Sequence, residues 1–140
     1  MNQQLTSPFW ALRIGIGVAA FLAGLDKFFN ILANWESYLS PLVAQWIPVT
    51  PAAFMRAAGV IEMLAGAAVL AGLTRLGGYV VAAWLLAIAA SLVTTGQFFD
   101  VAVRDVIMAI AAFTMARMSE VREVSSERIE ASLAQRTVRA

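Results

Sequence analysis

The chain has 140 residues, of which 61% are hydrophobic and only 14% are charged, with a net charge of +1 and a mean hydropathy of +0.77. Because soluble domains carry about 25% charged residues, this composition predicts one compact integral membrane protein. The chain has no cysteine and no histidine, which excludes disulfides, iron–sulfur clusters, thiolate metal sites, histidine-ligated haem and metal sites built on histidine. No patch of basic and aromatic residues indicates nucleic-acid binding.

The first predicted transmembrane helix covers residues 8–30. It lacks the basic start and the cleavage site of a signal peptide, so we expect it to be retained. Arg13 lies near its start, where the side chain can reach the interface, and Asp26 and Lys27 lie near its far end. Glycines permit close contact with another helix, and this segment contains three: Gly15, Gly17 and Gly24.

Residues 31–50 are too polar and too interrupted by proline to cross a bilayer. We expect a short interfacial helix or a re-entrant cap here, broken by Pro41 and Pro48. Three aromatic residues of this connection suit the lipid headgroup region: Trp35, Tyr38 and Trp46. They are interpreted either as a lid over a site among the helices or as an anchor in the interface.

The second predicted span covers residues 51–72, and Pro51 suits its first turn. Glu62 lies roughly halfway along it, where a charge costs about 2.5–3.5 kcal/mol on insertion scales. Gly59, Glu62 and Gly66 share one face at helical spacing. Because the glycines let a neighbouring helix approach, Glu62 is predicted to face the interior of the bundle.

The last two predicted spans cover residues 77–95 and 99–118, and a tight turn over residues 72–78 precedes them. The third span has no charged residue, whereas the fourth has three in its first turns: Asp100, Arg104 and Asp105. Residues 119–140 form a polar tail of mixed charge with a weak helical stripe of apolar residues. We interpret this tail as a solvated helix or, alternatively, as a helix that docks on a partner.

Four spans would place both termini on one side of the membrane. Arg13, Arg75 and the arginines from Arg117 onward all fall on that side. Cytoplasmic loops carry an excess of Lys and Arg, so this side is predicted to be the cytoplasm.

Charged residues of several spans fall in the half of the membrane away from that side when depth is counted at about 1.5 Å per helical residue. This candidate cluster comprises Asp26, Lys27, Arg56, Glu62, Arg104 and Asp105, with Asp100 at its mouth. Opposite charges at one depth should pair, so the cluster is interpreted as a salt-bridge network that fixes helix register. The alternative is a pocket under the aromatic connection that holds a quinone carbonyl or a small anion and manages its protons.

The first span resembles the opening helix of the DoxX family of small four-helix membrane proteins, through Arg13, Gly17, Phe21, Gly24 and Lys27 in RIGIGVAAFLAGLDK. The second span resembles that family's second helix, through Gly59, Glu62, Ala65, Gly66 and Gly72 in GVIEMLAGAAVLAG. Arg104 and Asp105 are similar to the family's polar entry to the fourth helix, and the resemblance covers residues 8–118. It identifies five family-like polar residues: Arg13, Lys27, Glu62, Arg104 and Asp105.

Some members of that family form the membrane subunit of thiosulfate:quinone oxidoreductase, and others accompany oxidative-stress proteins at the membrane. The resemblance therefore implies an integral membrane subunit of a quinone-linked redox system, not catalytic alone. A dissociable quinone is compatible with this chain, while covalent cofactors, cofactors held by His or Cys, and metals are not expected. One alternative is a non-catalytic anchor or assembly subunit, and another is a small-molecule permease in which Glu62 is the ion-coupled carboxylate.

We therefore expect an all-α integral membrane four-helix bundle with an interfacial aromatic loop between its first two helices. Its partners are predicted to be the lipid bilayer and either another protein or further copies of this chain, and not nucleic acid. The expected location is a bacterial-type cytoplasmic (inner) membrane, crossed several times, with both termini in the cytoplasm.

Overall fold

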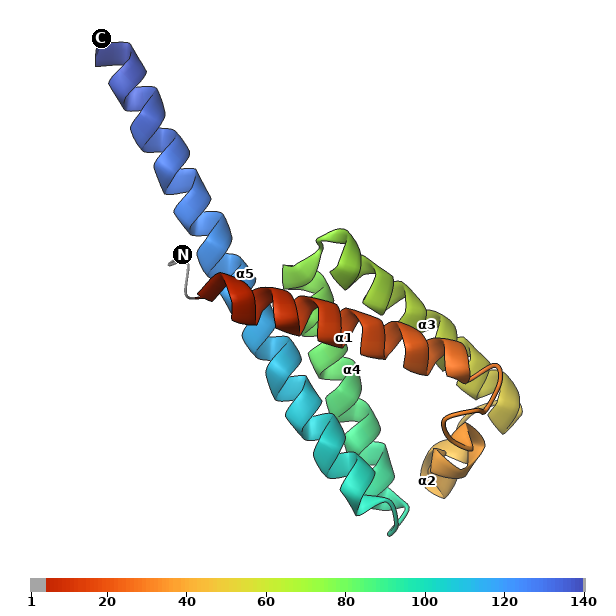
Figure 1. The fold of residues 1–140 in the computed structure, drawn as a ribbon. Helices are drawn as coiled ribbons and strands as arrows, with labels where there is room; N and C mark the ends of the chain where they lie inside the picture. The colour runs from red at the N-terminus through yellow and green to blue at the C-terminus, as the bar shows by residue number, and fades with distance from the viewer. Residues whose placement is uncertain (1–4, 140) are drawn as a thin grey trace.

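The computed structural model describes residues 5–139, and these are all helical apart from short connections (Figure 1). The long helices are α1 (Thr6–Asp26), α3 (Pro51–Ala71), α4 (Thr74–Thr94) and α5 (Phe99–Arg139). The connection from α1 to α3 contains the 3-10 helix η2 (Trp35–Tyr38) and the short helix α2 (Pro41–Ala44). The prediction of an all-α protein is confirmed.

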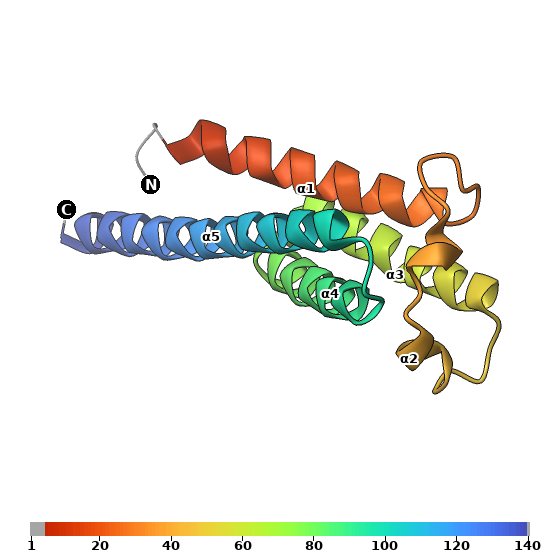
Figure 2. The same ribbon diagram turned by 90° about the horizontal axis from the view of Figure 1, so that it is seen from below.

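The four long helices form two antiparallel pairs. Helix α1 lies against α3, and α4 lies against α5, as both ribbon views show (Figures 1 and 2). The two pairs cross, so they touch near one end and separate toward the other, where the α1–α3 connection lies. Both ends of the described chain leave the molecule on the side away from this connection. The cytoplasmic location of the termini stays a prediction.

Glycines bring α1 and α3 into close contact, as their spacing predicts. A Cβ atom on Gly24 would lie 2.5 Å from the carbonyl oxygen of Gly59, and one on Gly66 would lie 2.6 Å from that of Gly17. Larger residues at these positions would push the two helices apart, so the glycines fix which faces of α1 and α3 meet.

The side chain of Arg13 on α1 binds the end of α3. Its Nε atom donates to the carbonyl oxygen of Val69 at 3.1 Å, and Nη2 donates to that of Leu70 at 2.6 Å. These carbonyls belong to the last turn of α3, where Val69 also accepts from the N–H of Gly72. Arg13 therefore caps α3 and holds its end against α1.

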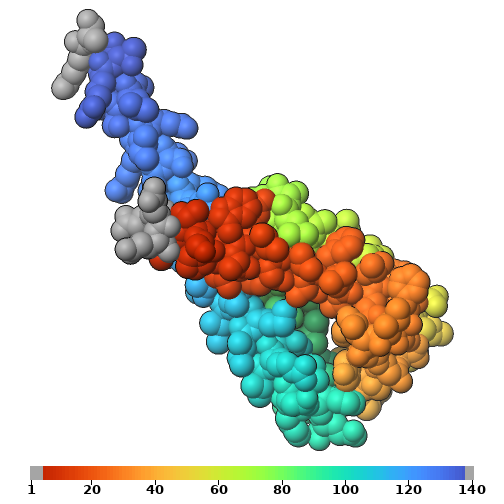
Figure 3. All heavy atoms as spheres, in the orientation of Figure 1, coloured from red at the N-terminus to blue at the C-terminus, as the bar shows by residue number. Residues whose placement is uncertain are grey.

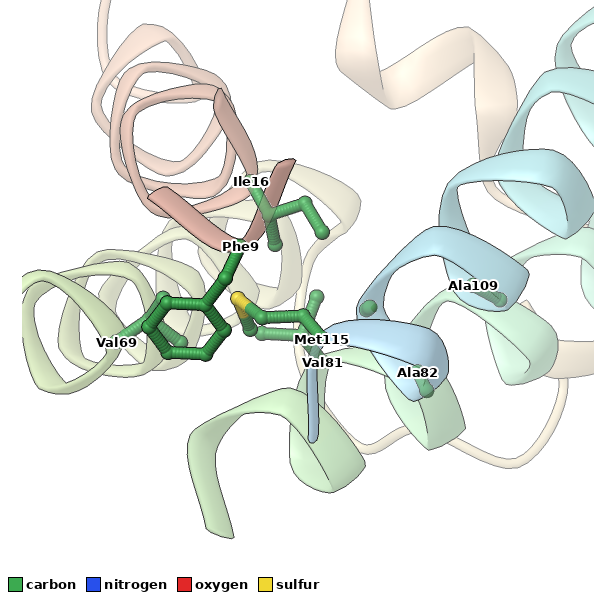
Figure 4. Close-up of a cluster of buried hydrophobic side chains, with 8 residues drawn as sticks. Phe9, Ile16, Val69, Val81, Ala82, Ala109 and Met115 are labelled. Carbon is green, nitrogen blue, oxygen red and sulfur yellow. The ribbon is translucent and has the colours of Figure 1, made fainter. Parts of the chain in front are cut away.

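The end where the two pairs touch has a buried apolar core, which we call the closed end. Its residues come from all four long helices: Phe9, Ile16, Val69, Val81, Ala82, Ala109, Ala112 and Met115. Figure 4 shows the ring of Phe9 next to Val69 and Met115. Val69 and Met115 have no exposed surface. This cluster is what joins the α1–α3 pair to the α4–α5 pair.

Three helices, α1, α3 and α4, are long and apolar enough to cross a membrane. Helix α5 differs because its uncharged run, Val106–Ala116, lies between Asp105 and Arg117 and is shorter than the ~20 apolar residues that a span requires. It also does not end at residue 118, since the predicted tail continues the same helix to Arg139. The structure thus supports a membrane protein with three candidate spans, and the four-helix membrane bundle is not confirmed.

Helix boundaries also differ from the predicted spans, for local reasons. Helix α1 ends at Asp26 rather than at residue 30, because the Asp26 carboxylate accepts the backbone N–H groups of the turn that follows. The turn after α3 needs only Gly72, whose φ of +114° is left-handed. Gly77 lies inside α4, where the side chain of Val69 fills the space a Cβ would take. Pro41 begins α2 instead of breaking it.

Candidate functional site

A cavity of about 610 Å³ lies between the two helix pairs where they separate. All four long helices and the α1–α3 connection contribute to its walls, and most of the lining side chains are apolar. Figure 3 shows a hollow on this face, bounded by α1, the connection and the first half of α5, with α4 behind. The end of the molecule that holds the cavity is called the loop end below.

A buried ion pair lies in the wall of this cavity. Lys27 Nζ lies 2.6 Å from Glu62 Oε2, and their side chains are only 5% and 9% exposed. The other oxygen, Glu62 Oε1, accepts a hydrogen bond of 2.9 Å from Trp84 Nε1. Glu62 on α3 is therefore tied to Lys27 at the end of α1 and to Trp84 on α4. The prediction that Glu62 faces the interior is confirmed, since only 7% of the residue is exposed.

Trp35 covers the ion pair from the connection. Lys27 Nζ lies over its ring, 3.7 Å from the ring centroid, which is a cation–π contact. Its Nε1 donates to Asp26 Oδ2 at 2.8 Å, and Asp26 also accepts from the backbone N–H groups of Ile31 and Leu32 at 2.9 Å. Asp26 therefore fixes the start of the connection through hydrogen bonds, and Lys27 fixes it through the cation–π contact with Trp35.

The far part of the connection is attached to the α4–α5 pair. Ser40 is fully buried, and its Oγ lies 2.6 Å from Thr94 Oγ1 at the end of α4. Tyr38 packs edge-to-face on Phe98 with ring centroids 4.7 Å apart. Phe98 has a φ of +58°, which is unusual for a bulky residue and aims its backbone into the turn before α5. The connection thus spans the loop end of the cavity and is fixed at both sides.

Arg104 and Asp105 enter the cavity wall from α5. Arg104 Nη2 donates to Asp100 Oδ2 at 3.0 Å, and these two side chains are 71% and 73% exposed. Asp105 is partly buried. The charges in the cavity wall are therefore two cations and two anions, Lys27 and Arg104 with Glu62 and Asp105.

The structure brings together four of the six members of the predicted charge cluster: Lys27, Glu62, Arg104 and Asp105. Asp26 lies beside them but binds the connection, and Arg56 is exposed outside the cavity lining. Of the aromatic lid candidates, Trp35 and Tyr38 line the cavity. Trp46 is 87% exposed and does not line it.

Sequence reasoning missed two contributors. Trp84 is a hydrogen-bond donor to Glu62, and the pattern that could have found it is a lone tryptophan in an uncharged span, since a buried indole N–H needs an acceptor. Ser40 was not singled out either, although a serine before Pro41 suits a helix N-cap, and its Oγ accepts from the N–H of Leu42.

The chemistry available in the cavity is that of an apolar chamber with a few hydrogen-bonding groups. Among residues 5–139, no cluster of three or more acidic, histidine or cysteine side chains could hold a metal ion. The balanced charges and apolar walls suit an uncharged ligand with oxygen acceptors better than a bare ion, whose charge would stay uncompensated. In the cavity wall, the ammonium of Lys27 is a buried hydrogen-bond donor, and the carboxylate of Glu62 is a buried acceptor.

Comparison with known protein families gives a match that includes several residues of this site. The model of the DoxX family matches residues 9–95, which contain α1, the connection, α3 and α4. The match stops before α5, so the similarity inferred for Arg104 and Asp105 lies outside it. No curated protein and no solved structure matches the chain. Because the matched residues make up more than half of the sequence and include Lys27, Glu62 and Trp84, the chain belongs to the DoxX family.

Proposed function

We propose that this protein is a membrane subunit of a quinone-linked redox system and that its cavity binds the quinone headgroup. The observation that carries the proposal is the buried Lys27–Glu62 pair in the wall of an otherwise apolar cavity. A bound quinone accepts two electrons and two protons, so a site for it needs hydrogen-bond donors and a route for protons within a largely apolar space.

The size and lining of the cavity support this proposal. Its volume of about 610 Å³ falls within the range of roughly 300–1,000 Å³ that is typical of small-molecule pockets. Lys27 would donate to a carbonyl oxygen, and Glu62 beside it would take and return a proton. Trp35 and Tyr38 would keep water away from this end. The chain has no cysteine or histidine to hold an electron carrier, so a partner protein would supply the electrons.

One observation favours a second candidate, a non-catalytic anchor or assembly subunit. Both oxygens of Glu62 already have partners, Lys27 and Trp84, so the group is fully satisfied without any ligand. The three residues connect α1, α3 and α4, and such a network would serve equally well to hold the helices in register.

The two candidates are distinguished by measuring ligand binding and stability on the same variants. The protein is reconstituted in nanodiscs with ubiquinone, and retained quinone is measured by native mass spectrometry. Arg104→Gln alters the cavity wall, and Arg56→Gln is its matched control, since both arginines are exposed but only Arg104 lines the cavity. Quinone bound to the wild type, weakened by Arg104→Gln and by Glu62→Gln but not by Arg56→Gln, would support the redox subunit.

The contrary result is equally clear. If the wild-type protein retains no quinone, and Glu62→Gln lowers only the thermal stability, the ion pair is a brace and the protein is an anchor or assembly subunit.

A further inference from the structure

Building on the proposed function, we infer that the ligand is an amphiphile whose apolar chain leaves the cavity sideways, through the gap between α1 and α5, into the bilayer. Its polar end then lies against Lys27 and Glu62, and its chain lies against Ile16 and Ala20. The inference names the class of quinone, one carrying a long apolar chain, and the side on which that chain exits.

Polar and apolar residues occupy opposite parts of the cavity. The polar part lies toward the connection and contains Lys27, Glu62 and Trp84. The apolar part lies toward the closed end, since Ile16 and Val81 belong both to the cavity lining and to the closed-end core. A ligand that matches both parts needs a polar head and an apolar extension.

One face of α1 runs the length of the cavity. Ile16, Ala20, Ala23 and Lys27 all line it, at the spacing that puts residues on one side of a helix. From Ile16 to Lys27 this face is about 16 Å long at the α-helical rise. Three of its four side chains are apolar and two are alanines, so the face is a smooth trough that leads from the charged end toward the closed end.

The connection covers the cavity at the loop end, whereas the side of the cavity between α1 and α5 is left uncovered. The connection is fixed by Asp26 at one end and by the Ser40–Thr94 hydrogen bond at the other. Among the described residues, the packing between α1 and α5 involves the first half of α1, through Phe9 and Ile16 and through Arg122, which stacks on Phe9. Beyond that point the two helices separate, and Figure 3 shows the hollow between them.

Apolar side chains line the cavity on both helices that border the gap: Ala19 and Ala23 on α1, and Met108 on α5. The outer faces of the same helices are also apolar: Val18 and Leu22 on α1 are 40% and 50% exposed, and Val103 and Ile107 on α5 are each 60% exposed. Such side chains suit contact with lipid, and three helices of this chain are apolar enough to cross a membrane. A ligand chain that leaves through this gap therefore passes apolar side chains of α1 and enters lipid, while Arg104 lines the cavity on the α5 side.

The test compares two benzoquinones with the same dimethoxy-substituted ring, one without a prenyl chain and one with a chain of several isoprene units. Binding is measured in nanodiscs by quenching of tryptophan fluorescence, in a Trp10→Phe/Trp46→Phe background. This background keeps only Trp35 and Trp84, which both line the cavity. Concentrations are expressed per bilayer volume, because a prenyl chain gains little by leaving lipid for a protein groove.

Ala20→Phe fills the trough, Met108→Phe narrows the gap from the α5 side, and Ala11→Phe is the control on the part of α1 outside the cavity. We expect the unaltered background to bind both quinones within about threefold of each other, and each gap variant to weaken the prenylated quinone by about tenfold or more while leaving the other nearly unchanged. Ala11→Phe should change neither. Thermal unfolding of each variant shows that it is folded.

The failures are distinguishable. If both quinones bind but the gap variants weaken them equally or not at all, or if the background excludes the prenylated quinone, the sideways exit is wrong while the proposed function stands. If neither quinone binds, the proposed function is overturned, and this inference with it.

Discussion

The two ends of the molecule are built from the same four helices in opposite ways. At the closed end, Val69 and Met115 are completely buried in an apolar cluster to which every long helix contributes. At the loop end the helix pairs stand apart around a cavity, and the contacts there are few and polar. The buried Lys27–Glu62 ion pair joins α1 to α3, and the Trp84–Glu62 hydrogen bond joins that pair of helices to α4.

Stability and the capacity to change shape are located at different ends of the molecule. At the closed end the stabilising free energy is spread over many small contacts, so no single residue decides it. At the loop end it depends on a few hydrogen-bonded and charged groups, and each of these is costly to leave without its partner. The loop end can therefore change shape through one or two contacts while the closed end keeps the helices together.

The largest effect is expected from separating the buried ion pair. Lys27→Met or Glu62→Leu alone leaves a buried charge without its partner and should lower the free energy of unfolding by about 3–5 kcal/mol. The double variant removes both charges and should recover most of this loss, because apolar replacements of a buried ion pair are often neutral. Chemical unfolding in detergent or bicelles measures all three proteins.

A double variant as unstable as the sum of the single variants would contradict this expectation. It would mean that Lys27 and Glu62 act independently, with the Trp84 hydrogen bond rather than the ion pair carrying the stability.

A smaller effect is expected at the closed end. Met115→Ala should lower the free energy of unfolding by about 2 kcal/mol, near the low end for such truncations, because lipid already solvates apolar groups and mainly the cavity cost remains. Met115→Leu keeps the volume and is the control, with a loss under about 1.5 kcal/mol. Neither variant should change quinone binding, since Met115 does not line the cavity.

The attachment of the connection should matter less again. Ser40→Ala removes both the hydrogen bond to Thr94 and the N-cap of α2, for a loss of about 1 kcal/mol. Amide hydrogen exchange over residues 31–44 should become faster while exchange at the closed end stays unchanged. Thr94→Val keeps the N-cap of α2 but removes the hydrogen bond to Ser40 and the one from Thr94 Oγ1 to the Ser91 carbonyl oxygen. Slower exchange in Thr94→Val than in Ser40→Ala would therefore reveal the contribution of the N-cap. Equal acceleration at both ends would show that the ends are not independent.

The sequence predicted the burial of Glu62 but not its partner. A carboxylate between Gly59 and Gly66 on one face of an apolar helix has to point inward, and it does. Three cations, Lys27, Arg56 and Arg104, lie at membrane depths from which they could reach Glu62, however. Depth alone does not determine how each helix is rotated about its axis. The contact of Gly24 with Gly59 sets that rotation and brings Lys27 to Glu62, while Arg56 on the same helix as Glu62 turns outward.

The predicted boundary at residue 118 came from hydropathy, which marks where the apolar segment ends and not where the helix ends. Polarity rises sharply after Met118, yet the chain contains no glycine or proline after Gly96. Without a stop residue the helix continues to Arg139, because Glu, Arg, Ala and Leu are good helix formers. The shape of the cavity could not be predicted from the sequence, because the cavity arises where two helix pairs cross and no local sequence pattern encodes that crossing.

The smallest effect on stability is expected at Arg104. Its partner Asp100 lies one turn away, and both side chains are mostly exposed, so Arg104→Gln should change the free energy of unfolding by no more than about 0.5 kcal/mol. Arg56→Gln should do the same at a position outside the cavity. Chemical unfolding of the two variants side by side is therefore a sensitive comparison. A loss well above 1 kcal/mol at Arg104 alone would place its guanidinium in the network that holds the loop end together. With stability unchanged, a loss of ligand binding at Arg104 would instead reflect contact with the ligand, because nothing else at the loop end would have moved.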